Sequence, residues 1–174
     1  MLFASRGTAD AAIGMVAVPE FKECPIGAED LPGAPLHYRR IPGFLIDATE
    51  VTVSQVDQQE DWYLPEKLAP NPPPADFPLT SVRYDYAVAF AERIGKRLPE
   101  EAEFEAAATN GGQRPTPWGG ALSDLGEWTM GPVKQSPRFD VIRYVDNLWG
   151  MYSNAIEWTS TWGIHYPKFA QIAP

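Results

Sequence analysis

The sequence predicts an α+β domain in which short strands and two short helices are joined by long irregular loops. Eighteen prolines and fourteen glycines among 174 residues interrupt the chain too often for a helical bundle. Apolar residues make up 44% of the chain, enough for one buried core. A helical spacing of apolar residues occurs in one segment, and an acidic, alanine-rich run follows it.

The amino-terminal part shows strand patterns. We expect residues 1–13 to be a loose lead-in and residues 14–174 to form a single domain. Residues 15–18 (MVAV) are an apolar run closed by Pro19, which is typical of a strand. Residues 41–56 combine β-branched and aromatic residues with polar alternation, and this pattern predicts a strand that leads into a short helix or turn.

The first helix is predicted over residues 85–94. Asp85 can cap its amino end, and Gly95 can end it in a left-handed conformation. Its apolar positions follow the spacing i, i+3, i+4 and i+7 and are Ala87, Phe90, Ala91 and Ile94.

The second helix is predicted from the stretch GKRLPEEAEFEAAA, residues 95–108. Pro99 suits a first helical turn, where its missing N–H has no partner to lose. The glutamates after it favour the positive end of the helix dipole, so we interpret them as helix-start residues in preference to general acids or metal ligands. We expect Leu98 to enter the core and Arg97 to pair with an acidic neighbour.

The carboxyl-terminal part is rich in tryptophan and glycine. Residues 155–162 (AIEWTSTW) alternate in a strand-like manner. Aromatic clusters can bind sugars or cations, but we interpret the tryptophans as core-filling residues. They are Trp118, Trp128, Trp149, Trp158 and Trp162.

Charge and cysteine content exclude several classes of protein. The net charge of −9 disfavours nucleic acid and anionic membranes as partners, and no window of the sequence is long and apolar enough to span a bilayer. Cys24 is the one cysteine, so no disulfide can form within these residues. We expect a cytoplasmic protein.

Several motifs resemble one known family, in the same order along the chain. GKRLPEEAEFEAAATNGG is similar to the Gly-Lys-Arg-Leu-Pro-Thr-Glu-Ala-Glu-Trp core of the formylglycine-generating-enzyme/sulfatase-modifying-factor domain family. MVAVPEFKECPIG, FLIDATEVTVSQV, TPWGG and NLWGMYSNAIEWTSTW resemble other segments of that family. The resemblance implies a C-type-lectin-like α+β fold over about residues 14–162.

The resemblance also implies where chemistry should lie, and this chain departs from it. The family's oxidase converts a sulfatase cysteine to formylglycine with a carboxyl-terminal cysteine pair that binds copper. That pair and its end of the fold are absent here, and Cys24 alone cannot make a two-thiolate copper site. Iron-dependent relatives use a His-x3-His-x-Glu cluster, whereas His37 and His165 are isolated. We therefore expect neither copper nor iron, and assign no catalytic residue.

A calcium site is implied by the resemblance around Glu157. Its ligands would be the Glu157 carboxylate, the carbonyls of Ser153 and Ala155, and a side chain at position 150. Because Gly150 stands where the family has Asp or Asn, we expect a weakened or empty site. Alternatively, Glu157 accepts backbone N–H bonds from a neighbouring loop.

Two functions remain open, with a third as a weaker interpretation. The first is a non-catalytic binding or sensory module with a protein or peptide ligand. GMYSNAIEWT is similar to versions of this domain attached to bacterial serine/threonine kinases, so a kinase outside this chain is a possible fusion partner. The second is the amino-terminal part of a copper-dependent formylglycine-generating oxidase. The third is a structural interaction protein without a small-molecule partner.

Overall fold

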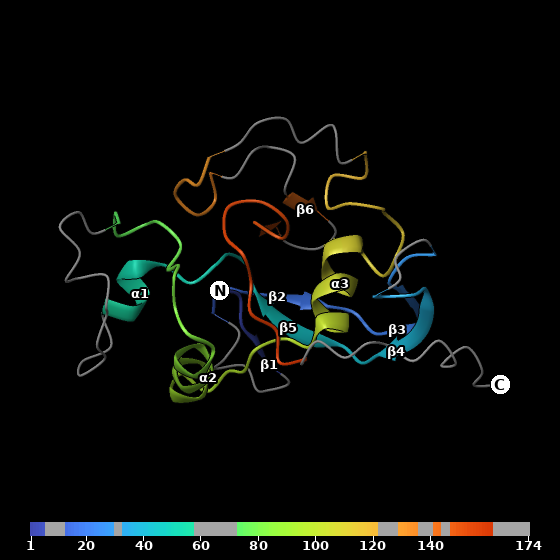
Figure 1. The fold of residues 1–174 in the computed structure, drawn as a ribbon, viewed down its shortest axis with the longest axis horizontal. Coiled ribbons are helices and arrows are strands. Elements are labelled where there is room, and N and C mark those ends of the chain that lie inside the picture. Colours follow the sequence, from blue (N-terminus) through green and yellow to red (C-terminus); the bar gives the residue numbers. More distant parts are fainter. Residues whose placement is uncertain are drawn as a thin grey trace.

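A computed structural model describes residues 1–5, 13–29, 33–57, 73–121, 129–135, 141–143 and 147–161. Short strands and three helices lie in these segments, joined by irregular backbone (Figure 1). In chain order the elements are β1 (Ala4–Ser5), β2 (Met15–Val18), β3 (Phe21–Ile26), β4 (His37–Ile41), β5 (Phe44–Asp47), α1 (Val53–Asp57), α2 (Tyr84–Arg93), α3 (Glu101–Thr109), β6 (Val141–Arg143) and β7 (Asn147–Trp149).

The central sheet has the order β1-β5-β2 and is antiparallel throughout. Ala4 of β1 and Val16 of β2 both lie opposite Ile46 of β5, whose side chain is fully buried. β-branched residues pack well on such a pleated, half-buried surface. The sheet confirms the strand predicted at residues 15–18 and the one predicted within residues 41–56.

The first five residues are part of the core, where the sequence predicts a loose lead-in. The prediction is wrong for these residues because Ala4 pairs with β5 on one side and with the backbone of Arg97 on the other. Successive strand residues point to opposite faces. Leu2 accordingly packs in a cluster with α3, and Phe3 packs in a second cluster with α2.

The two longer helices, α2 and α3, pack against opposite faces of the amino-terminal segment that contains β1 (Figure 1). On α2 the buried positions are Ala87, Phe90 and Ala91, the stripe predicted from the sequence. The α3 helix presents small side chains to the strands, so it packs close against them. Its buried apolar residues are Ala102, Ala106, Ala107 and Ala108.

At the ends of α2, the structure differs from the predicted amino-terminal cap and confirms the predicted conformation of Gly95. Asp85 does not cap α2: Arg83 is the capping residue, and its guanidinium pairs with the Asp85 carboxylate at 2.9 Å. Gly95 has φ +71°, the left-handed conformation expected after this helix. The helix α1 after β5 confirms the predicted helix or turn, and it makes three helices in the described segments where the fold prediction has two.

β3 and β4 form a separate antiparallel pair beside α3. The left-handed turn after α3 packs on β3, and a Cβ atom at Gly111 or Gly112 would collide with the rings of Phe21 and Pro25. The absence of these two side chains lets the helix end approach the strand. β6 and β7 form a further antiparallel pair.

The tryptophans do not fill the core as predicted. Trp118 and Trp149 are half-buried and Trp158 is exposed, while Trp128 and Trp162 lie outside the described residues. The core is filled instead by residues of the sheet, its flanking loops and α2, and the largest buried rings are those of Phe3 and Phe90. None of the helices in the described segments is long and apolar enough to cross a membrane.

Candidate functional site

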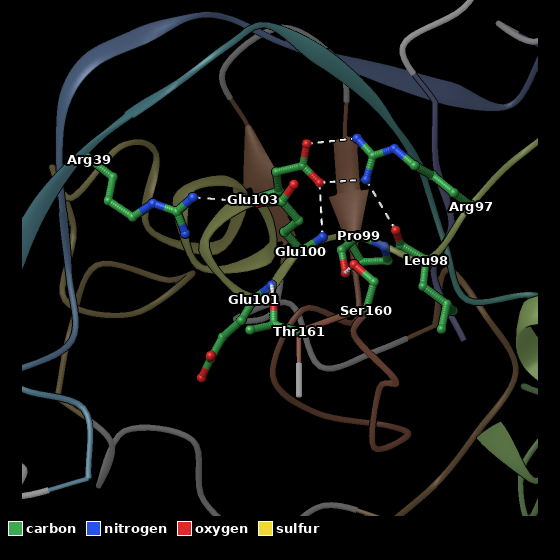
Figure 2. A network of polar contacts seen from close by, with 9 residues as sticks. All are labelled: Arg39, Arg97, Leu98, Pro99, Glu100, Glu101, Glu103, Ser160 and Thr161. Carbon is green, nitrogen blue, oxygen red and sulfur yellow. Dashed lines mark hydrogen bonds and ion pairs between the residues drawn. The ribbon is translucent and has the colours of Figure 1, made fainter. Parts of the chain in front are cut away.

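The motif GKRLP joins the sheet to α3 (Figure 2). The backbone of Arg97 exchanges two hydrogen bonds with Ala4, at 2.8 and 3.0 Å. Its guanidinium donates to both carboxylate oxygens of Glu103, at 2.6 and 2.7 Å. Leu98 is buried, as expected, and Lys96 pairs with Asp47 of β5 at 2.6 Å. The motif therefore connects the central sheet to the first turn of α3.

The glutamates at the start of α3 are structural, as predicted. Glu100 is the capping residue, and its side chain and that of Glu103 form a capping box. A Glu103 oxygen accepts the Glu100 N–H at 2.9 Å, and the Glu103 side chain is only 4% exposed. Arg39 of β4 lies 3.5 Å from the Glu100 carboxylate.

The end of the last described segment, residues 160–161, lies against the start of α3 (Figure 2). Ser160 donates its backbone N–H to the carbonyl of Pro99 at 2.8 Å, and the Thr161 hydroxyl accepts the N–H of Glu101 at 3.0 Å. The indole N–H of Trp158 donates to the carbonyl of Val82 at 3.1 Å. These bonds hold Ser160 and Thr161 at the start of α3 and Trp158 beside the start of α2.

The alternation predicted at residues 155–162 is present in residues 155–161, and Glu157, Thr159 and Thr161 form its more buried side. Residues 155–161 form no strand. The side chains of Glu157 and Thr161 face inward, where they accept the backbone N–H groups of Leu2 and Glu101. The apolar side chains of Ile156 and Trp158 face outward and are 99% and 42% exposed. Exposed apolar side chains that lie together on a surface can mark an interaction site.

Two cavities lie beside this outward face. One of about 390 Å³ has Tyr84, Val88 and Leu98 in its wall together with charged groups of Glu92, Arg97 and Glu100, and Ser160. The other, of about 350 Å³, is lined by residues that include Met130, Ile156 and Trp158. The rings of Tyr84 and Trp158 meet edge to face at 5.6 Å, so they separate the two cavities. We call Tyr84, Met130, Ile156 and Trp158 the aromatic face.

The residues predicted to bind calcium lie just before this face. Ser153 is buried, and its carbonyl accepts the N–H of Ala155 at 3.0 Å. The Glu157 side chain is 5% exposed, and its Oε2 accepts the N–H of Leu2 at 2.6 Å and lies 3.3 Å from the α-amino group of Met1. This oxygen matches the alternative expectation of a backbone acceptor, whereas Oε1 is buried without a partner.

Glu50 is a member of this region that the sequence analysis missed. It is fully buried, and neither carboxylate oxygen has a hydrogen-bond partner. Burial, with the nearby charge of Glu157 adding to it, raises the pKa of Glu50 to about 7, although the Met1 amine opposes the rise. A carboxylate in the middle of the apolar segment FLIDATEVTV is the sequence signal that could have found it.

The Glu50 carboxylate lies directly beside Gly150. Gly150 has φ +70°, and a Cβ atom added to it would lie 2.5 and 2.7 Å from the two Glu50 oxygens. The Glu50 carboxylate therefore fills the space that a side chain at position 150 would enter.

These groups fit the donor set of a hard divalent cation. Three buried carboxylate oxygens, two of Glu50 and one of Glu157, lack partners, and calcium prefers carboxylate and carbonyl oxygens. In the described segments no three side chains of His, Cys, Asp or Glu converge as a metal site by themselves. Backbone carbonyls such as those of Ser153 and Ala155 would have to complete the coordination.

The candidate redox ligands do not come together in the described segments. Cys24 is fully buried in β3, where burial and then the charge of Glu105 raise the pKa of its thiol. The Nδ1 of His37 lies 2.9 Å from the carbonyl of Pro35. His165 lies outside the described residues.

Comparison with known proteins covers most of the chain. Residues 10–169 match the sulfatase-modifying factor enzyme 1-like domain. The formylglycine-generating enzyme of Bos taurus is 31% identical over 159 residues, which are 76% of this chain and 42% of the enzyme. The enzyme of the same name from Mus musculus is 32% identical over 69% of this chain and 39% of its own length.

A relative of another kind also matches. The serine/threonine-protein kinase Pkn1 of Chlamydia trachomatis is 30% identical over 155 residues, which are 74% of this chain and 24% of the kinase. The chain thus spans about two fifths of the two enzymes and about a quarter of the kinase. The family to which the sequence motifs are similar agrees with these matches.

Proposed function

The chain belongs to the sulfatase-modifying factor enzyme 1-like domain family, and on that premise we propose that it is a non-catalytic recognition module for a protein or peptide ligand. The observation that carries the proposal is the aromatic face. Ile156 is 99% exposed although its neighbours Glu157 and Asn154 are buried, so the backbone is held in place while the apolar side chain remains in water.

The aromatic face has the physical properties of a binding surface. Tryptophan and tyrosine contribute a large part of the binding energy at protein interfaces, and cavities beside them accept a partner's side chains. Trp158 is fixed by its bond to Val82 and by its contact with Tyr84. A side chain that is already fixed loses less conformational entropy when it binds.

The state of the thiol supports a role without catalysis. A cysteine acts as nucleophile or metal ligand through its thiolate, which requires access and a low pKa. Cys24 has neither property, because it is fully buried and its pKa is raised. In the same proposal the domain is cytoplasmic and serves as an accessory unit of a protein kinase, for which the match to Pkn1 is the support.

The second candidate is the amino-terminal part of a copper-dependent formylglycine-generating oxidase. The matches to relatives named formylglycine-generating enzyme favour it. In that case the thiols for copper would come from residues outside these 174, because Cys24 is the one cysteine among them. The two candidates differ in whether the chain needs other residues to perform its task.

Selection of peptides tests the recognition module. A library of random peptides selected on the purified chain should yield binders whose affinity falls at least about tenfold in Trp158→Ala, since truncating a central interface aromatic typically costs more than 1 kcal/mol. The matched control is Tyr38→Ala, which removes an aromatic ring that is 66% exposed on β4, away from the aromatic face. Titration calorimetry measures both variants.

The proposal fails if the selected peptides bind Trp158→Ala as tightly as the unmodified chain. It also fails if Tyr38→Ala weakens them equally, since binding would then depend on exposed rings in general. Circular dichroism of each variant separates loss of binding from loss of fold.

A further inference from the structure

The larger cavity beside the aromatic face combines an apolar wall with acidic groups. Tyr84 and Val88 of α2 and the buried Leu98 supply the apolar part of this cavity of about 390 Å³. The carboxylates of Glu92 and Glu100 line it as well. Such a wall suits a ligand with an aliphatic part and a charged end, and the groups that are already paired decide the sign of that charge.

The positive group in the wall is already neutralised. Arg97 donates to both carboxylate oxygens of Glu103, at 2.6 and 2.7 Å, and to the carbonyl of Leu98 at 3.1 Å (Figure 2). A two-bond pair between guanidinium and carboxylate is among the stronger polar contacts in proteins. An anionic ligand would have to compete with this pair, so the cavity disfavours a negative charge.

Glu92 is the unpaired negative group of the wall. Its side chain is exposed and has no hydrogen bond or ion pair with the described residues, whereas Glu100 lies 3.5 Å from Arg39. Glu92 is also in the last turn of α2, where the helix dipole disfavours a negative charge. The fold therefore gains nothing from this carboxylate through the contacts described, and a cation in the cavity would supply the missing partner.

We propose that the partner of the aromatic face inserts a lysine or arginine side chain into this cavity, where its charge pairs with Glu92. The inference rests on the recognition module and specifies its ligand. Lysine and arginine bury their aliphatic stems against apolar surface and keep the charged end at the rim, and a cation is also attracted to an aromatic face such as that of Tyr84. The net charge of −9 favours the approach of a basic partner.

The smaller cavity takes an apolar side chain of the same partner. Its volume is about 350 Å³, and its lining residues, which include Leu79, Ile156 and Trp158, carry no charged side chain. Because the edge-to-face contact of Tyr84 with Trp158 separates the two cavities, one bound segment can place a side chain in each. The ligand class is a peptide segment with a basic residue close to an apolar one.

The peptides selected on the purified chain test this ligand class. Those whose binding depends on Trp158 should be enriched, relative to the unselected library, in lysine or arginine near an apolar residue. Replacing the basic residue with norleucine, or with citrulline in the case of arginine, keeps the stem and removes the charge. We expect the affinity to fall about fivefold, the upper range for a partly exposed ion pair. Titration calorimetry measures the change.

The variant Glu92→Gln tests the other side of the contact. It should weaken the basic peptide about fivefold and leave its neutral analogue unchanged, because the two changes remove the same interaction. Its thermal midpoint should not fall, since the charge at this helix end is unfavourable. The matched control is Glu23→Gln, which removes the same charge from an exposed position of β3 that lines neither cavity and should keep the full affinity.

Three results overturn the inference and leave the recognition module intact. They are Trp158-dependent peptides without the basic residue, equal binding of the basic peptide to Glu92→Gln and to the unmodified chain, and an equal loss in Glu23→Gln. The last of these would assign the effect to net charge. A selection that yields no Trp158-dependent peptide overturns the recognition module, and this inference with it.

Discussion

Replacing Arg97 with Ala is expected to lower the free energy of unfolding by about 3 kcal/mol. The reason is the position of Glu103, whose side chain is 4% exposed and whose two oxygens both accept from the guanidinium. Without Arg97 this carboxylate stays buried with no positive partner, and the capping box that begins α3 is weakened with it. Urea unfolding followed by circular dichroism measures the change.

Arg83→Ala is the matched control for Arg97. Arg83 pairs with Asp85 at 2.9 Å, but both side chains are mostly exposed, and such pairs contribute little. The urea midpoint of this variant should stay close to that of the unmodified chain. Equal losses in the two variants would contradict the role assigned to Arg97. The double variant Arg97→Met, Glu103→Met should recover part of the loss, because no buried charge is left behind.

The second large effect concerns Glu50 and pH. The chain should lose up to about 3 kcal/mol of stability through Glu50 as the pH rises from about 4.5 to about 7. The folded state holds this proton more tightly than the unfolded state, so the contribution is full below the unfolded pKa and is lost as the pH passes the folded pKa. The charged groups facing Glu50 are Glu157 and the Met1 amine, with the Asn154 amide beside them.

Glu50→Gln isolates this contribution. Buried Asp47, Glu157 and Glu105 also have raised pKa values, so the unmodified chain has a compound pH dependence. The difference between the chain and Glu50→Gln, measured by urea unfolding at pH 5 and pH 8, removes the groups they share. The variant should be the more stable of the two at pH 8. If the difference does not change with pH, the Glu50 carboxyl is not buried as the structure shows.

Local patterns predicted much of the scaffold. The apolar stripe of α2 and the left-handed Gly95 follow from spacing and backbone preference, and the structure confirms both. The salt bridge of Arg97 and the burial of Leu98 were expected from the motif GKRLP itself. These features depend on residues near one another in the chain, which is why sequence alone indicated them.

Features set by distant contacts were missed. Met1–Ser5 looks like a lead-in because its burial requires β5 and Arg97, more than 40 and 90 residues away in the chain. The inward side of residues 155–161 was not predicted, because it depends on Leu2 and Glu101, whose backbone N–H groups bind the polar side chains of Glu157 and Thr161. Local alternation gives the period of a segment but does not say which face the rest of the fold will cover.

In the candidate site, too, some residues were predicted from the sequence and one was missed. The resemblance to the family implied that Ser153, Ala155 and Glu157 lie near one another. Glu50 was not, because it lies a hundred residues before Gly150, and its importance follows from the contact between them. The three-dimensional arrangement shows that the Glu50 carboxylate occupies the space beside Gly150.

The central claim is that these residues recognise a partner without performing the oxidation suggested by the names of their relatives. The most direct test incubates the purified chain with copper, a thiol reductant and a peptide that carries the sulfatase cysteine motif, and follows the peptide by mass spectrometry. The formylglycine-generating enzyme of Bos taurus serves as the positive control. We predict an unchanged peptide mass with this chain. A mass loss that corresponds to conversion of the thiol to an aldehyde would contradict the account.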